Sequence, residues 1–245
     1  PAGYQMGLAV AWLGDMALVG APGADNFQGA VRTYTRNQMT GEWSEGLTLA
    51  AHDRQPGAGF GAALGSTADA LWVGAPGADR AGRVYRLERA AAAERFGDVS
   101  KIAGIDQDVG DGFGTVIAIG ANTAVVGQTT DDFSMGSAII LSRSGDEWMA
   151  TAKVMGEAPD PLPALTGEDV RCDDELADQF PCENVDIRSF LPVSAIGGGR
   201  GAETNDVWGW TDPEANREIA IVGRTDGTAF IDVTDANRPR YLGTL

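Results

Sequence analysis

The segment Gly20-Ala21-Pro22-Gly23-Ala24-Asp25 recurs without change at Gly74-Ala75-Pro76-Gly77-Ala78-Asp79, 54 residues further along the chain. Thirteen residues before each segment stands another glycine, in the pairs Met6-Gly7 and Phe60-Gly61. A third copy begins at Phe113-Gly114 and drifts to Gly127-Gln128-Thr129 in its loop. A period close to fifty residues is typical of a propeller or a solenoid.

Each copy contains four short runs with the alternation expected of β-strands. In the first copy these runs are 8–13, 16–20, 29–34 and 47–51. Glycine, aspartate and asparagine turns between short apolar runs predict β-hairpins, and four strands per period predict the blade of a β-propeller. The run 90–93 has helix propensity, but the repeat places it at a hairpin tip. The predicted fold class is all-β, with four antiparallel strands in each blade.

These residues resemble the FG-GAP repeat of integrin α heads and of secreted bacterial propellers. Phe60-Gly61 and Phe113-Gly114 supply the FG, while 20–22 and 74–76 supply the GAP. The resemblance covers residues 1–156 and implies about three propeller blades.

A different pattern occupies the end of the chain. Residues 218–223 and 227–233 alternate around the turn Asp226-Gly227, which is a strong hairpin signal. Residues 172–245 resemble the lead-in and first blade of LVIVD-repeat proteins of the choice-of-anchor B family, which has no agreed activity. We therefore expect repeat blades over 1–156, a proline-rich and acidic linker or insertion over 157–204, and one blade over 205–245. Three blades of one type and one of another also suggest a portion of a longer chain.

The composition is strongly acidic, with a net charge of −17 and 43% hydrophobic residues. This charge disfavours nucleic acid and anionic lipid as partners, because both carry phosphates. No apolar run approaches the roughly 18–20 residues of a membrane span. Chain length allows one large core or two smaller ones.

Cys172 and Cys182 are the only cysteines and lie in an acidic segment, residues 168–186. Their spacing suggests a disulfide that restrains a surface loop, with two free thiols as the alternative. A disulfide implies an oxidising compartment. We expect a periplasmic or extracellular protein that associates with membranes as an extrinsic subunit.

Groups typical of catalysis are scarce. His52 is the single histidine, and neither a Gly-x-Ser-x-Gly elbow nor a phosphate-binding loop is present. The sequence therefore predicts no catalytic residues, no enzyme activity and no cofactor apart from a calcium candidate. That candidate is Asp106, Asp108 and Asp111, because alternate carboxylates on a glycine-containing loop can wrap a hard cation. Integrin-type blades bind calcium between their first two strands, where this chain has only short turns, so a solvated acidic turn is the alternative.

The function predicted on these grounds is a non-catalytic extracytoplasmic scaffold that binds protein partners through its loops. The expected partner is a membrane complex capped from its periplasmic face, such as a photosynthetic reaction-centre assembly. The alternatives are a secreted or surface-anchored adhesion propeller, or an enzyme whose catalytic residues lie outside these residues. The predicted partner-binding residues are arginines, aromatic residues and a leucine of the second half: Arg188, Phe190, Leu191, Arg200, Trp208 and Trp210. The two tryptophans could instead cover a blade edge.

Overall fold

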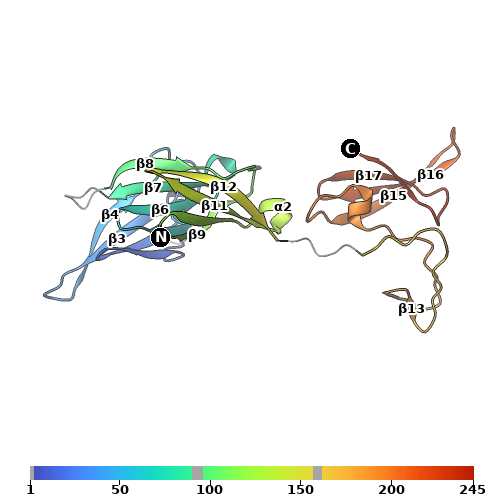
Figure 1. Cartoon of the computed structure of the whole chain (residues 1–245), viewed down its shortest axis with the longest axis horizontal. Coiled ribbons are helices and arrows are strands. Elements are labelled where there is room, and N and C mark those ends of the chain that lie inside the picture. The colour runs from blue at the N-terminus through green and yellow to red at the C-terminus, as the bar shows by residue number, and fades with distance from the viewer. Residues whose placement is uncertain (1–2, 90–95, 157–161) are drawn as a thin grey trace. The chain divides into compact units, whose positions relative to one another are not determined.

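The computed structural model describes residues 3–89, 96–156 and 162–245, and its chain divides into two compact units, 1–156 and 157–245. Unit 1 contains three four-stranded antiparallel sheets, and unit 2 contains one such sheet and a two-stranded one (Figure 1). In every sheet the neighbouring strands are also neighbours in sequence. The predicted all-β, propeller-like fold is confirmed. The helix considered at 90–93 lies outside the described residues.

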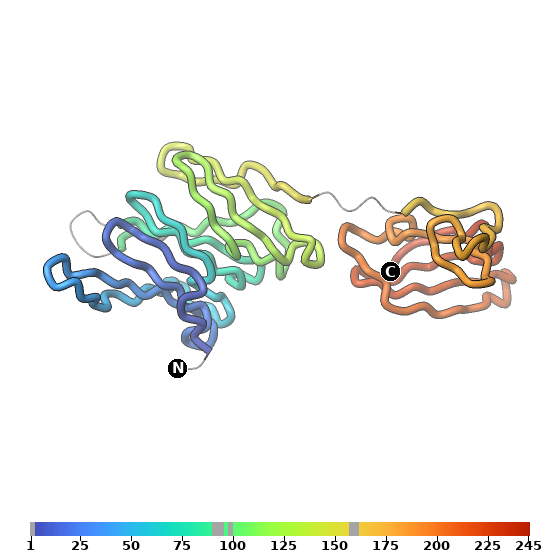
Figure 2. The backbone as a smooth tube through the Cα atoms, turned by 90° about the horizontal axis from the view of Figure 1, so that it is seen from below, coloured from blue at the N-terminus to red at the C-terminus, as the bar shows by residue number. Residues whose placement is uncertain are grey.

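Unit 1 contains three sheets, blades 1 to 3, which follow one another in chain order (Figure 2). The strands of blade 1 are β1 Val10–Leu13, β2 Met16–Ala21, β3 Ala30–Arg36 and β4 Trp43–Leu49. Those of blade 2 are β5 Ala63–Ser66, β6 Ala70–Ala75, β7 Arg83–Arg89 and β8 Phe96–Ile102. Those of blade 3 are β9 Phe113–Ile119, β10 Thr123–Gln128, β11 Ser137–Ser144 and β12 Glu147–Met155.

The repeated glycines lie at the junctions between blades. A Cβ at Gly20 would overlap the carbonyl oxygen of Gly61, and a Cβ at Gly74 would overlap that of Gly114. Next to these contacts, Gly29 pairs with Phe60 and Gly82 with Phe113 in parallel bridges. The aromatic–Gly pair of one blade therefore docks onto two glycines of the blade before it, with a backbone approach that only glycine permits.

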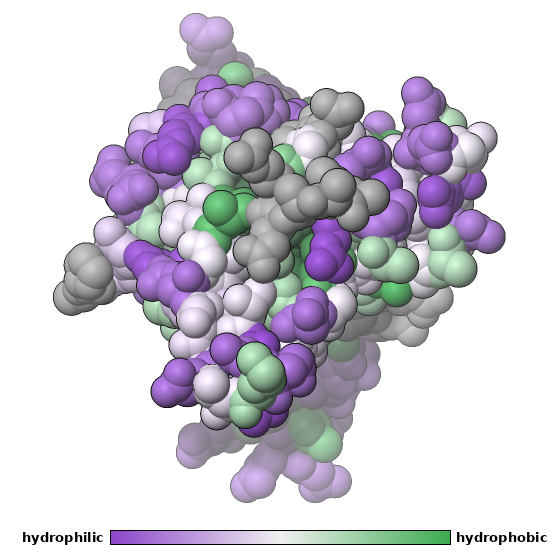
Figure 3. Space-filling model, turned by 90° about the vertical axis from the view of Figure 1, so that its left-hand side faces the viewer, coloured by the Kyte–Doolittle hydropathy of each residue, from purple (hydrophilic) through white to green (hydrophobic). Residues whose placement is uncertain are grey.

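Two apolar clusters fill the spaces between these sheets. The first joins blades 1 and 2 around Leu18, Phe60 and Tyr85, and the second joins blades 2 and 3 around Trp72 and Phe113. Hydrophilic residues predominate around the edge of the face of unit 1 seen in Figure 3, in keeping with the net charge. The cores thus lie between blades, as in stacked repeat architectures.

The loop after the second strand of each blade coils into a short helical turn that the sequence did not predict. These turns are α1 Ala24–Phe27, η1 Ala78–Arg80 and α2 Asp131–Ser134. Each contains residues with positive φ, among them Asp25, Asp79 and Asp132. Aspartate and asparagine tolerate this left-handed conformation better than most residues, so the turn is local and has no apolar periodicity to reveal it.

Unit 2 contains blade 4 and the segment that precedes it. Its strands are β15 Thr204–Asp212, β16 Arg217–Arg224, β17 Gly227–Asp232 and β18 Arg240–Thr244. The predicted hairpin joins β16 to β17, but its two turn residues are Thr225 and Asp226, one position earlier than predicted, and Gly227 is the first residue of β17, paired with Arg224. The short pair β13 Leu176–Ala177 and β14 Phe180–Pro181 and the turn η2 Val193–Ile196 come before it. The predicted disulfide between Cys172 and Cys182 is present, with 5.9 Å between the Cα atoms.

One face of the blade 4 sheet packs against this preceding segment. Ala229 and Ile231 contact Ile196 and the partly buried Leu191 in a small core. Among the residues that the structure describes, no helix has the length and apolar character needed to cross a bilayer.

Candidate active site

In each blade, the loop that enters the first strand and the loop that follows the second strand lie at one end of the sheet. This placement follows from the antiparallel order, because the start of one strand faces the end of its neighbour. We call it the loop end of the blade. The only lysines of the chain, Lys101 and Lys153, form ion pairs with aspartates at the loop ends of blades 2 and 3.

In blade 2 the loop end is closed by a polar network. Lys101 Nζ lies 2.7 Å from Asp53 Oδ2 and 2.8 Å from Asp79 Oδ2. The side-chain amide of Gln55 donates to Asp79 Oδ1 at 2.7 Å and accepts from the Asp79 backbone N–H at 2.8 Å. The Tyr85 hydroxyl donates to Asp53 Oδ1 at 2.9 Å. Each carboxylate has several partners, so this network joins the two loops to β7 and β8.

This network makes the stability of unit 1 depend on acid pH. Burial acts to raise the pKa of Asp53, but its hydrogen bonds from Lys101 and Tyr85 outweigh burial and lower the pKa from 3.8 to about 2. The ionised carboxylate therefore contributes about 2 kcal/mol of stability above pH 4, which is lost as the pH falls toward 2. We expect Lys101→Met to move the acid-unfolding midpoint to higher pH in a titration followed by circular dichroism. Arg143→Met, which breaks an exposed 3.6 Å pair with Asp146, serves as the control, and an equal shift in both variants would contradict the assignment.

Blade 3 keeps the loop geometry but changes the residues. Relative to the aromatic–Gly pair of each blade, Asp108 stands where blade 2 has Gln55, and Asp111 stands where it has Ala58. Relative to the glycine that ends the second strand, Asp131 stands where blade 2 has Ala78. A carboxylate at 108 cannot donate as the Gln55 amide does. A cavity of about 360 Å³ lies at this position, lined by residues 108–111 and 130–133.

Two of the carboxylates at this cavity are buried, and they differ in their partners. Asp111 Oδ2 accepts from the backbone N–H of Asp108 at 2.7 Å and from the buried Gln128 amide at 3.1 Å. Asp131 lies 2.9 Å from Lys153 Nζ. One carboxylate is therefore held by neutral donors and the other by a cation.

The surroundings of the two carboxyl groups differ in their effect on proton binding. Burial raises the pKa of Asp111, and the charge of Asp131 adds to this effect, although the Asp108 N–H opposes it. Burial acts to lower the pKa of Lys153, but the hydrogen bond and charge of Asp131 outweigh burial and raise it, so the ammonium form is favoured. The cavity therefore combines a carboxylate paired with an ammonium group and a second carboxyl group that burial makes easier to protonate, which is an arrangement suited to acid–base chemistry.

The residues predicted to bind calcium do not form a metal site in the described residues. No group of three or more His, Cys, Asp or Glu side chains there is placed to hold a metal ion. Asp108 and Asp111 both line the cavity, whereas Asp106 is not among its lining residues. Asp111 is already engaged by two protein donors, which leaves it less able to serve as a ligand.

The predicted partner-binding residues are spread over unit 2. Arg188 pairs with Asp169 at 2.9 Å, and Phe190 packs on Phe180 with 4.8 Å between ring centroids. Leu191 contributes to the small core of this unit, and Arg200 is half-buried. These four residues thus have structural contacts within the unit.

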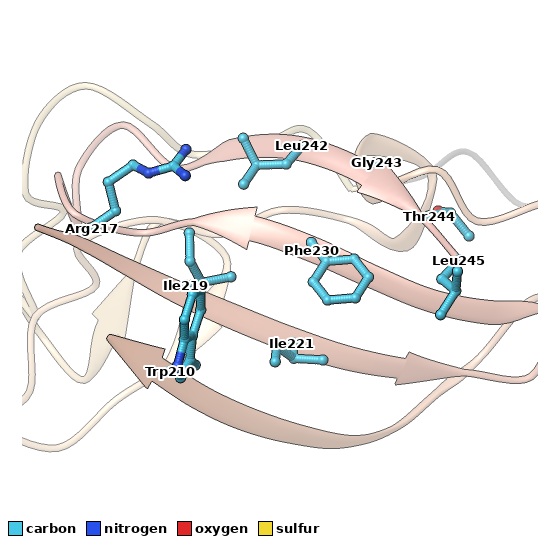
Figure 4. A pocket seen from close by; sticks show the side chains of 9 residues that line it. All are labelled: Trp210, Arg217, Ile219, Ile221, Phe230, Leu242, Gly243, Thr244 and Leu245. Atoms are coloured by element: carbon cyan, nitrogen blue, oxygen red, sulfur yellow. The ribbon is translucent and has the colours of Figure 1, made fainter. Parts of the chain in front are cut away.

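The two tryptophans of β15 lie on the other face of the blade 4 sheet. Trp208 is exposed, and Trp210 lines a cavity of about 400 Å³ with Ile219, Ile221 and Phe230 (Figure 4). This cavity is mainly apolar, and Arg217 is the ionisable side chain in its lining. It offers an apolar surface but no acid–base pair.

Asp131 and Lys153 were missed by sequence reasoning. The available signal was the position of the two lysines, which stand 52 residues apart at equivalent places on the fourth strands of successive blades. Lys101 pairs in register with Tyr85, and Lys153 with Ile139. Lysine is rare in this chain, which has 16 arginines but only two lysines. Because both lysines stand at equivalent places in the repeat, they indicate a shared role at the loop end.

No family model matches the chain, and no curated protein matches it. Solved structures align along almost its whole length at low similarity. One is a protein of Bacteroides uniformis named as a 6-phosphogluconolactonase, with 12% identity, a TM-score of 0.40, and coverage of 97% of this chain and 71% of that one. A periplasmic gluconolactonase of Pseudomonas aeruginosa aligns with 9% identity and a TM-score of 0.43, over 97% of this chain and 71% of that one. Sqt1 of Saccharomyces cerevisiae aligns with 13% identity and a TM-score of 0.41, over 100% of this chain and 63% of that one.

Two of these three proteins are named as lactonases, which corrects the predictions of a non-catalytic scaffold and of no enzyme activity. The sequence-based reasoning gave weight to the missing histidine and serine motifs. Buried carboxylates can also perform acid–base chemistry, and which of 35 acidic residues are buried becomes visible only in the fold. Because alignments this distant show no shared mechanism, any chemistry has to come from residues of this chain.

Proposed function

We propose that the loop end of blade 3 is a hydrolytic active site that acts on a small uncharged ester or lactone. The observation that supports this proposal is the pair of buried carboxylates at the 360 Å³ cavity, Asp111 with a raised pKa and Asp131 paired with Lys153. Two carboxyl groups whose surroundings favour different protonation states are a recurrent acid–base arrangement.

The roles follow from the charge states. Asp131, ionised beside Lys153, takes a proton from a water molecule as the water oxygen attacks the carbonyl carbon of the substrate. Asp111, in the protonated form that burial favours, gives its proton to the alkoxide oxygen that leaves as the carbon–oxygen bond breaks, and the products are a carboxylic acid and a hydroxyl group. Lys153 acts as a positioning residue, because it holds Asp131 and is not among the residues that line the cavity.

The charge of the cavity limits the substrate. Asp108, Asp111, Asp131 and Asp132 all line it, so a phosphorylated or carboxylated substrate is repelled. An uncharged sugar lactone or a simple ester is not repelled by these carboxylates and therefore suits the cavity better. Two of the aligned propellers carry lactonase names, but what supports hydrolysis here is the carboxylate pair of this chain.

The test is hydrolysis of glucono-δ-lactone, dihydrocoumarin and p-nitrophenyl acetate by the full chain. We expect at least one of them to be hydrolysed above the buffer rate, and Asp111→Asn to lower kcat/KM by about 100-fold. Because Asp111 acts as an acid, the rate should fall as the pH rises through its raised pKa. Asp146→Asn, at a side chain that is 97% exposed, is the control.

A stability measurement separates a catalytic role from a structural one. Burial raises the pKa of Asp111, so its ionisation in the folded state costs free energy as the pH rises above the value of the unfolded chain. Asparagine removes this cost, and Asp111→Asn should therefore unfold at the same temperature as the parent at pH 7, or higher. No hydrolysis of any of the three compounds, or equal rates in the variant and the parent, would overturn the proposal.

The disulfide supports a compartment for this activity. Cys172 and Cys182 are bonded, and such bonds persist mainly in oxidising surroundings. We infer that the protein works in the periplasm or outside the cell.

A further inference from the structure

Two buried polar residues of blade 3 stand where blade 2 has alanines. Asp111 and Gln128 occupy the positions of Ala58 and Ala75. The two alanines belong to the buried cluster that joins blades 1 and 2, and the two polar residues are likewise buried, at 4% and 0% exposure. Burying a carboxyl group and an amide costs free energy unless hydrogen bonds compensate. Packing alone therefore gives no reason for polar groups at these two positions.

An irregular ladder between β9 and β10 brings the two side chains together. In blade 2 the pairing of β5 with β6 ends at Gly74. In blade 3 the equivalent ladder continues past Gly127 after a register shift, so that Gln128 pairs with Phe113 of β9. Irregularities of this kind re-aim a side chain and are common beside active sites. Here Gln128 meets the loop that precedes β9, and its amide Nε2 lies 3.1 Å from Asp111 Oδ2.

Two donors reach the same oxygen of Asp111. Oδ2 accepts from the Asp108 backbone N–H at 2.7 Å as well as from Gln128, whereas Oδ1 has no hydrogen-bond partner in the part of the chain that the structure describes. In a protonated carboxyl group the carbonyl oxygen is the better acceptor and the hydroxyl oxygen donates. Two donors on Oδ2 therefore make it the carbonyl oxygen, and the proton lies on Oδ1. Since Asp111 lines the cavity, Oδ1 is the atom from which it can give a proton.

We infer that Gln128 is a positioning residue of the blade 3 site, which holds Asp111 so that its proton lies on Oδ1. The inference rests on the proposed hydrolytic function for its catalytic consequence. Gln128 does not touch the substrate, because it is fully buried and is not among the residues that line the cavity. Its amide oxygen is buried without a hydrogen-bond partner among the described residues. An unpaired acceptor costs stability, so what the amide provides is its bond to Asp111.

The direction of the pH effect follows from the groups around Asp111. The charged ones lie on its own loop, on the loop after β10 and on β12: Asp108, Asp131, Asp132 and Lys153. Burial raises the pKa of Asp111 most, and the charges of Asp131 and Asp108 add to it, whereas the Asp108 N–H and the charge of Lys153 oppose it. The Gln128 amide bonds the ionised carboxylate more strongly than the neutral acid, so it also acts to lower this pKa. Without the amide, Asp111 should stay protonated to higher pH.

The test compares the full chain with its Gln128→Met variant, because methionine keeps the unbranched shape of the side chain but cannot donate. On the acid side of the pH profile, where Asp111 is protonated in both proteins, we expect kcat to fall by about 10-fold, a part of what a general acid contributes. KM should stay the same, since Gln128 does not reach the cavity. The decline of the rate with rising pH should move to higher pH.

A second measurement needs no turnover. Carbon NMR of the Asp111 carboxyl group, identified by its absence in Asp111→Asn, should show a raised pKa in Gln128→Met. Gln55→Met is the matched control, because it removes an equivalent amide–carboxylate bond, 2.7 Å long, at the loop end of blade 2. It should leave kcat and the pH profile unchanged. If Gln128→Met does not fold, Gln128→Ala, which restores the residue that blade 2 has at this position, should give the same changes.

The outcomes separate this inference from the proposed function. An active parent whose Gln128→Met variant keeps the same kcat, pH profile and Asp111 pKa would overturn the role of Gln128 and leave the hydrolytic function standing. A lower kcat without any change in the pH profile or in the Asp111 pKa would make Gln128 a structural residue and would also overturn the inference. An inactive parent would overturn the proposed function, and the catalytic role of Gln128 with it.

Discussion

Replacing Gly74 with alanine is expected to lower the free energy of unfolding of unit 1 by about 3 kcal/mol, the upper range for overpacking. The added Cβ would overlap the carbonyl oxygen of Gly114 and come within 3.1 Å of the Ala63 Cβ. Both neighbours belong to the β-strand region of the junction, so neither can move without disturbing its ladder. For a unit of this size the unfolding temperature should fall by roughly 6–12 °C, measured by calorimetry on the full chain.

Gly127→Ala is the matched control for this substitution, because it occupies the same position in the next blade and meets only Val116 at 3.4 Å or more. It should change the free energy of unfolding by less than about 0.5 kcal/mol. Equal losses at Gly74 and Gly127 would show that the close backbone approach is not what requires glycine.

Trp72→Ala is expected to cost about 4 kcal/mol, as large-to-small substitutions of a buried tryptophan do. Trp72 is completely buried and packs edge-on against Trp148, with 4.8 Å between ring centroids. It belongs to the cluster that joins blades 2 and 3 through Phe113. Its loss should therefore lower the stability of both blades, which chemical denaturation of the full chain would measure.

Trp72→Phe distinguishes loss of volume from loss of polar contact. The indole N–H of Trp72 is buried without a hydrogen-bond partner among the described residues, so phenylalanine removes an unsatisfied donor while keeping most of the ring. We expect a loss of only about 1 kcal/mol. Trp208→Ala, at a tryptophan that is 73% exposed, should be nearly neutral, and a Trp72→Phe variant as unstable as Trp72→Ala would contradict this explanation.

The repeat made most of the strands of unit 1 predictable. Each strand lies between glycine-containing turns at a constant distance from its aromatic–Gly pair, so the position of one blade fixes those of the others. The turn α1 was not predictable in this way, because it depends on the left-handed conformation of Asp25 and Asn26 and not on any apolar period. The hairpin of blade 4 was predictable from the two alternating apolar runs on either side of Asp226-Gly227, but the turn itself was placed one residue too late, because its central residues are Thr225 and Asp226.

The candidate active site was only partly visible in the sequence. Asp108 and Asp111 stood out because they are close together on one loop. Asp131 and Lys153 belong to other segments of blade 3, and their ion pair appears only when the strands are in register. Whether Asp111 is a calcium ligand or a proton donor depends on its burial and on Gln128, and neither is encoded by the spacing of carboxylates.

The junctions between blades rely on backbone atoms and glycines, so the loops are left free to change. Blade 3 has replaced Ala-Pro-Gly-Ala with Gln128-Thr129-Thr130-Asp131 after the shared glycine, yet its junction with blade 2 keeps the geometry of the first junction. A blade of this kind therefore behaves as an exchangeable cassette. Duplicated copies can diverge in chemistry at their loops while still assembling with their neighbours, and a designer could graft the loop of one blade onto another without redesigning the contact between them.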